Sequence, residues 1–169
     1  MGFFGKLFGT DDAKTAKEKK NSNAKSSNNM GVPYNEGLIE TLLKDHKNLV
    51  AEFSKIAKAA QSKKYKTLKQ YLKAFKVNLE IHNYSEKIQL YTYLKNYYKN
   101  SDEEDFINDM FNSAEEIYKD VFTFLKKYET IEFNDQYLAL FKNELEAIGR
   151  ILQSRIEVEE SELYPLYKR

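Results

Sequence analysis

Apolar residues recur at helical spacing almost without interruption from Pro33 onward, and few residues in this region could break a helix. The two prolines stand at 33 and 165, near the ends of the region. Apolar side chains three and four residues apart are typical of amphipathic α-helices. The pattern predicts helices at about 35–61 and 65–98, a third that begins at Ser101, and a fourth from Asn134 to Pro165. Long helices with short connections predict an all-α, up-down-up-down four-helix bundle.

Two helix starts have recognisable capping residues. Ser101 is followed three residues later by Glu104, the spacing of a capping box in which each side chain bonds the backbone of the other residue. Asn134 precedes the fourth apolar stripe and is a favourable N-cap. The Ser101–Glu104 pair and Asn134 each predict a helix start directly after a short connection.

The composition excludes several classes of function. The chain of 169 residues has no cysteine, which excludes disulfides, thiolate metal sites and cysteine nucleophiles. Its net charge of +1 offers no general attraction for nucleic acid. No apolar run is long enough to span a bilayer. Without a paired nucleophile and base or a glycine-rich phosphate loop, we expect a cytoplasmic protein that is not an enzyme.

The first 32 residues differ from the rest. Residues 10–32 are rich in Lys, Asn and Ser and nearly free of large apolar side chains, so we expect a disordered linker. In residues 1–9 four large apolar side chains share one side of a short amphipathic segment; they are Phe3, Phe4, Leu7 and Phe8. This segment predicts an anchor, either through a weak peripheral contact at the inner membrane face or in a groove of a partner protein, or else a terminus without a role. The bundle itself is expected at 33–169.

Five polar residues stand where the helical period calls for apolar ones: His46, His82, Glu86, Arg155 and Glu159. Burying such groups without partners costs on the order of several kcal/mol, so we expect them to contact one another. With about 1.5 Å of rise per residue, the two histidines lie at nearly the same height on adjacent antiparallel helices. The sequence therefore predicts one polar layer across the bundle.

Two interpretations of this layer remain open. Two imidazoles and two carboxylates suit one Fe or Zn ion, whereas a layer without metal needs only hydrogen bonds among its members. Arg155 also has two interpretations. Its guanidinium stays charged when buried and could hold Glu86 and Glu159 in place of a cation, or it could extend out of the bundle into solvent.

Six tyrosines gather near the predicted ends of the second and fourth helices. We expect most of them to close one end of the bundle with their hydroxyls in water, because no basic groove accompanies them for stacking on nucleic acid. They are Tyr91, Tyr93, Tyr97, Tyr98, Tyr164 and Tyr167.

Three stretches, taken in order, resemble the hemerythrin-like, or HHE cation-binding, family over residues 36–167. They are "LIETLLKDHKNLVAEF", "HNYSEK" and "RIEVEESELYPLY". The resemblance implies a bundle of four helices around two irons. It also implies that His46 and His82 match terminal ligands of one iron, that Glu86 matches a bridging carboxylate, and that Glu159 or Glu160 matches the other.

The chain departs from the family pattern in its second half. Tyr118 and Arg155 stand where the resemblance would place histidines of the second iron. These substitutions imply a degenerate member that binds at most one Fe or Zn and lacks a complete di-iron centre. On this interpretation Arg155 and Tyr118 substitute for ligands of the missing ion.

A further stretch is similar to a different family. The last long helix, "ELEAIGRILQSRIEVEESELY", resembles that of the regulator of sigma D anti-sigma factors.

From the hemerythrin-like resemblance we expect a non-enzymatic hemerythrin-like sensor or regulatory domain with an incomplete metal centre and a protein partner. The alternative is a metal-free, protein-binding regulator of the anti-sigma type.

Overall fold

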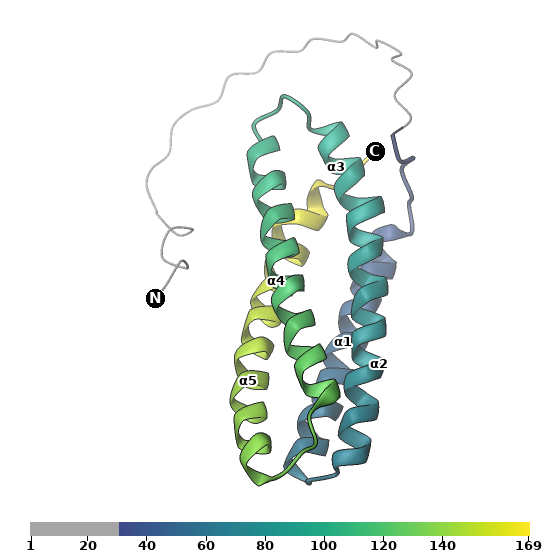
Figure 1. Cartoon of the computed structure of the whole chain (residues 1–169). Helices are drawn as coiled ribbons and strands as arrows, with labels where there is room; N and C mark the ends of the chain where they lie inside the picture. Colours follow the sequence, from purple (N-terminus) through teal and green to yellow (C-terminus); the bar gives the residue numbers. More distant parts are fainter. Residues whose placement is uncertain (1–30) are drawn as a thin grey trace.

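The computed structural model describes residues 31–169, which form four long helices packed side by side (Figure 1). The second and fourth long helices each contain a short π-helical segment. In chain order the elements are α1 (Leu38–Gln61), α2 (Tyr65–Ser85), the π-helical η1 (Glu86–Tyr91), α3 (Thr92–Tyr97), α4 (Glu104–Thr130), α5 (Asp135–Val158), the π-helical η2 (Glu159–Leu163) and the 3-10 turn η3 (Tyr164–Leu166).

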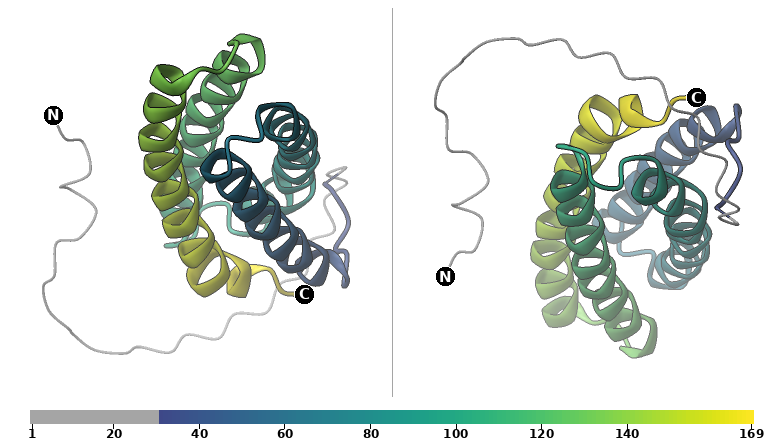
Figure 2. Two further views of the ribbon diagram at one scale, coloured as in Figure 1. Left: turned by 90° about the horizontal axis from the view of Figure 1, so that it is seen from below. Right: turned by 90° about the horizontal axis from the view of Figure 1, so that it is seen from above.

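Consecutive long helices run in opposite directions, the second of them being made of α2, η1 and α3. The α1–α2 and α4–α5 connections lie at one end of the bundle, and the α3–α4 connection lies at the other (Figure 1). When the bundle is viewed from either end, the α1–α2 hairpin lies beside the α4–α5 hairpin (Figure 2). The predicted up-down-up-down four-helix bundle is therefore confirmed.

The capping signals are confirmed at one helix start and shifted at the other. The side chain of Asn134 accepts a hydrogen bond from the Tyr137 amide at 2.9 Å, as an N-cap does. The third helix begins at Glu104 rather than Ser101. The Ser101 hydroxyl accepts from the Glu103 amide at 3.3 Å, while the Glu104 carboxylate accepts from the Asn100 amide at 2.6 Å. These bonds order the turn before the helix instead of its first residues.

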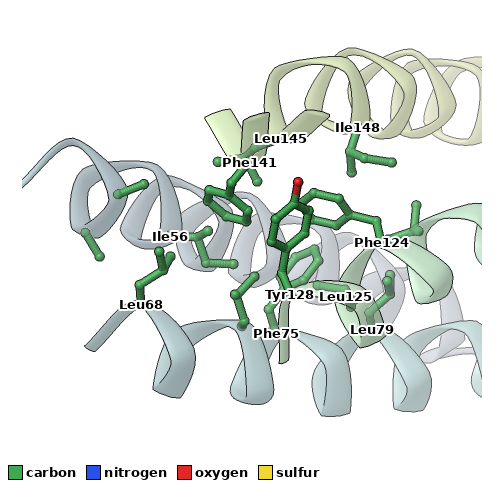
Figure 3. Close-up of a cluster of buried hydrophobic side chains, with 14 of the residues drawn as sticks. Ile56, Leu68, Phe75, Leu79, Phe124, Leu125, Tyr128, Phe141, Leu145 and Ile148 are labelled. Atoms are coloured by element: carbon green, nitrogen blue, oxygen red, sulfur yellow. The ribbon is translucent and has the colours of Figure 1, made fainter. Parts of the chain in front are cut away.

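The buried apolar side chains form two clusters. The larger lies toward the α1–α2 and α4–α5 connections and is partly drawn in Figure 3; it includes Ile56, Leu68, Phe75, Phe124, Tyr128 and Phe141. The smaller lies toward the other end and includes Leu42, Leu90, Leu94, Ile107 and Tyr164. Along each of the helices α1, α2 and α5, the predicted polar residues fall between these two clusters. The polar layer thus divides the core.

Several predictions for the first 32 residues fall outside the part of the chain that the structure describes. The amphipathic segment 1–9 and all but the last two residues of the linker 10–32 lie there. The peripheral membrane contact through Phe3, Phe4, Leu7 and Phe8 therefore stays a prediction. Within residues 31–169, none of the helices has the length and apolarity needed to cross a membrane.

We expect Phe141→Ala to lower the free energy of unfolding by about 3–5 kcal/mol. Phe141 is fully buried, and its ring lies 4.8 Å from that of Tyr128 and 5.6 Å from that of Phe124, measured between centroids (Figure 3). Leu140→Ala is the control, because Leu140 is 44 % exposed. Chemical denaturation of both variants measures the difference. Equal losses would show that the larger cluster does not carry the stability of the bundle.

Candidate metal centre

Four buried side chains bring potential metal-ligating atoms together in the polar layer. Within residues 31–169, one nitrogen or oxygen from each lies within 4.8 Å of the others; the residues are His46, His82, Glu86 and Glu159. They come from α1, α2, η1 and η2. Two donors on opposite sides of one ion lie at most about 4.4 Å apart, given bonds of about 2.0–2.2 Å. Movements of a few tenths of an ångström would let this group enclose an ion.

His46 is held at both ring nitrogens. Its Nδ1 lies 2.8 Å from Oε1 of Glu160, a partly exposed carboxylate, and donates to it. Its Nε2 faces the interior, 3.3 Å from Oε2 of Glu159. Burial alone would lower the pKa of His46, but Glu159 and then Glu160 outweigh it and raise the pKa. A carboxylate on the outer nitrogen is the usual support of a metal-binding histidine and directs the inner nitrogen at the ion.

His82 lacks the partners that a structural buried histidine would have. Its Nδ1 is buried without a hydrogen bond and lies 3.9 Å from Asp45, while its Nε2 lies 3.8 Å from Oε2 of Glu86. Burial, followed by the nearby charge of His46, lowers the pKa of His82 to about 4. His82 is therefore a neutral imidazole with a lone pair to offer, which is the form that binds metals.

The two oxygens of Glu159 have different partners. Oε1 accepts from Nε of Arg155 at 2.5 Å, and Oε2 faces His46. Burial on its own would raise the pKa of Glu159, but the hydrogen bond from His46 and the charge of Arg155 hold it below its usual value. Glu159 is thus an ionised carboxylate with a single oxygen left for an ion.

Arg155 lies inside the bundle. Its side chain is 9 % exposed, so the interpretation in which it extends into solvent is wrong. Besides Glu159, its guanidinium donates to the hydroxyl of Tyr91 and to the carbonyl of Met110, the latter at 3.1 Å. It does not bond Glu86 directly, contrary to the prediction that it would hold both carboxylates.

Glu86 is held by Tyr164 instead. The Tyr164 hydroxyl donates to Oε1 of Glu86 at 2.7 Å and lies 3.1 Å from Nε2 of His46. Burial, together with the neighbouring charge of Glu159, raises the pKa of Glu86 to about 8. Without an ion, Glu86 therefore keeps its proton at neutral pH.

Two residues proposed for the site from sequence lie outside the group of four. Glu160 supports His46 from the outer side and does not face the interior. Tyr118 is half-buried on α4, where its ring packs 4.6 Å from that of Phe122, and it is not among the partners of Arg155. The proposal that Tyr118 substitutes for a metal ligand has no contact to support it.

The sequence interpretation missed the roles of Tyr91 and Tyr164. We expected the end tyrosines to keep their hydroxyls in water, but these two hydroxyls bind members of the polar layer. Tyr98 and Tyr93 likewise donate to the carbonyls of Leu166 and Lys168. The signal that could have found them is their spacing, because Tyr91 and Tyr164 each follow a layer glutamate by five residues.

Each π-helical segment begins at a layer glutamate. η1 starts at Glu86 and η2 at Glu159. A π turn bonds residue i to i+5 and so holds an extra residue, and such turns are frequent at functional sites. The wider turn lets both the leucine and the tyrosine that follow each glutamate face inward; all four are buried, namely Leu90, Tyr91, Leu163 and Tyr164.

A largely apolar cavity of about 890 Å³ adjoins the four candidate ligands. Its walls come mainly from α1 and α5, with smaller contributions from α2 and α4; Leu49, Phe53, Ile117 and Leu152 are among the lining residues. Gly149 lets α5 approach the Phe53 ring closely, since a Cβ atom there would lie 3.0 Å from that ring. The volume falls in the range of small-molecule sites.

One of the comparisons with known proteins identifies a family. The model of the hemerythrin HHE cation binding domain family matches residues 37–167. No curated protein and no solved structure shows a significant match to the chain.

We expect Arg155→Met to lower the free energy of unfolding of the metal-free protein by about 3–5 kcal/mol, because it leaves the buried Glu159 carboxylate without its cation. Arg150→Met is the matched control. Arg150 pairs with Glu146 four residues away on the same helix, but both side chains are exposed, so a loss below about 1 kcal/mol is expected. Urea denaturation measures both. Equal effects would show that the buried Arg155–Glu159 pair contributes no more to stability than the exposed Arg150–Glu146 pair.

We expect the free energy of unfolding of the metal-free protein to fall as the pH rises from 6.5 to 8. Because the pKa of Glu86 is raised from 4.5 to about 8, its stabilising contribution is complete below pH 4.5 and is lost as the pH rises through 8. Glu86→Gln should make this decline shallower, whereas Glu80→Gln, at an exposed position of α2, should not. Denaturation in the presence of a chelator tests this. An unchanged slope in Glu86→Gln would contradict the raised pKa.

Proposed function

The chain belongs to the hemerythrin HHE cation-binding domain family, and on that premise we propose that it is a non-enzymatic regulatory domain that binds a single metal ion. The candidate ligands are His46, His82, Glu86 and Glu159. Two imidazoles and two carboxylates form a donor set that suits Fe or Zn.

One observation carries the stoichiometry of one ion. A carboxylate that bridges two ions uses both of its oxygens, but Oε1 of Glu159 is occupied by the Arg155 guanidinium at 2.5 Å. Only Oε2, on the His46 side, is left. The guanidinium also fills the space between Glu159, Tyr91 and the Met110 carbonyl with a fixed positive charge. A second ion beside Glu159 would have to displace that charge.

The positions of the candidate ligands support a regulatory role. His46 belongs to α1, His82 and Glu86 to the second long helix, and Glu159 to the fourth. An ion held by all of them links three helices and stabilises the folded bundle, increasingly so as the free ion concentration rises above the dissociation constant. A small apolar molecule could act as a second regulatory ligand, because the adjoining cavity is lined in part by the same four side chains.

The alternative is a metal-free regulator that binds a protein partner, as anti-sigma factors do. The polar layer would then serve only to fix the packing of the helices. The two proposals differ in one measurable quantity, which is the metal content of the purified chain.

We expect the full chain, purified under reducing conditions and supplied with Fe or Zn, to contain about one ion per molecule. Elemental analysis measures this content. His82→Ala and Glu159→Gln should each reduce it strongly, because each removes a donor from the group of four. Glu162→Gln is the matched control, since Glu162 lies three residues beyond Glu159 but is exposed. A content near zero in the unaltered chain would favour the metal-free alternative.

The role of Arg155 is tested by the same measurement. Arg155→His removes the fixed cation, frees Oε1 of Glu159 and supplies an imidazole, so the metal content should rise above one ion per chain. Arg150→His, on the exposed face of α5, should leave it unchanged. Two ions per molecule in the unaltered chain would show that the guanidinium does not limit the stoichiometry.

A further inference from the structure

The phenolic oxygen of Tyr164 lies within the candidate metal centre rather than beside it. The side chain is buried, with its hydroxyl 2.7 Å from Oε1 of Glu86 and 3.1 Å from Nε2 of His46. Its ring stacks on the imidazole of His46 at 5.6 Å between centroids. Two of the four candidate ligands are therefore in direct contact with this oxygen.

These contacts have the spacing of donors around one ion. With bonds of about 2.0–2.2 Å, neighbouring donors lie about 2.8–3.6 Å apart in octahedral or tetrahedral geometry. The Tyr164 oxygen lies 3.1 Å from Nε2 of His46, within this range, and 2.7 Å from Oε1 of Glu86, just below it, while Nε2 of His46 lies 3.3 Å from Oε2 of Glu159. The phenolic oxygen therefore lies where a further donor to the same ion would lie.

The contact with His46 distinguishes a ligand from a supporting residue. A supporting residue bonds the ring nitrogen that faces away from the ion, as Glu160 does at Nδ1. Tyr164 instead contacts Nε2, the nitrogen that faces the interior. It therefore lies on the side of the imidazole where the ion would bind.

We propose that Tyr164 is a fifth ligand of the ion and binds it through its phenolate oxygen, a role that rests on the proposed single-ion function. Binding replaces the O–H bond of Tyr164 and that of the protonated Glu86 with metal–oxygen bonds, and both protons pass to solvent without any change of oxidation state. Three anionic oxygen donors, from Tyr164, Glu86 and Glu159, favour a hard and highly charged cation. The site is accordingly selective for ferric iron over zinc.

The chain contains a matched comparison in Tyr91. Tyr91 follows Glu86 by five residues, as Tyr164 follows Glu159, and both side chains are buried at the end of a π-helical segment. The Tyr91 hydroxyl, however, accepts from Arg155 and contacts none of the four candidate ligands. Tyr91→Phe thus removes an equivalent buried hydroxyl, a partner of Arg155, but no proposed donor to the ion.

The test is the visible absorption of the full chain loaded with ferric iron. Phenolate bound to Fe(III) produces a charge-transfer band in the visible region, which carboxylate and imidazole ligands do not. We expect the unaltered chain and Tyr91→Phe to show this band with about one iron each. Tyr164→Phe should lose the band and bind iron about 10–100-fold more weakly, at least as large a loss as removing a supporting group causes.

The outcomes separate this inference from the proposed function. An iron content near one without a visible band, or a band that persists in Tyr164→Phe, would overturn the role of Tyr164 and leave the single-ion function intact. An iron content near zero in the unaltered chain would overturn both. Resonance Raman spectra of the unaltered chain, excited in the band, should show tyrosinate ring vibrations. This measurement does not depend on the folding of Tyr164→Phe. The absence of tyrosinate vibrations would by itself overturn the proposal.

Discussion

The burial of two carboxylates at mid-height in the bundle is the constraint around which the other polar residues are arranged. Glu86 and Glu159 are 4 % and 3 % exposed, and a carboxylate without partners at such a depth would be strongly destabilising. The two carboxylates are stabilised in different ways. Glu159 stays charged beside Arg155 and His46, whereas Glu86 is held by the Tyr164 hydroxyl and keeps a proton until an ion replaces it.

The two halves of the chain share one backbone feature but differ in chemistry. In each half a histidine or arginine precedes a glutamate by four residues, and a π turn then directs a tyrosine inward. In the first half the pair consists of His82 and Glu86, and both side chains belong to the candidate metal centre. In the second half Arg155 takes the histidine position and binds both Glu159 and Tyr91. One half of the layer is thus suited to an ion and the other carries a permanent cation.

The helices, the Asn134 cap and the residues of the polar layer could be predicted from the sequence, because periodicity determines which side chains face inward. Which nitrogen of His46 faces Glu160, and which oxygen of Glu159 faces Arg155, could not be predicted, since both depend on the rotation of helices that are distant in the chain. The π turns were also missed. Their hydrogen bonds have no residue signature, although the burial of adjacent residues such as Leu90 and Tyr91 violates the regular α-helical period.

The division of the core by the polar layer has a consequence for how the bundle opens. The smaller apolar cluster is built from the starts of α1 and α4, from η1 and α3, and from the last residues of the chain, and only the layer separates it from the larger cluster. Without an ion, this end is the weaker unit and is expected to unfold locally while the larger cluster stays folded. Amide hydrogen exchange at Leu42, Leu94 and Leu163 would then report on ion occupancy, and each opening would expose apolar side chains to a partner.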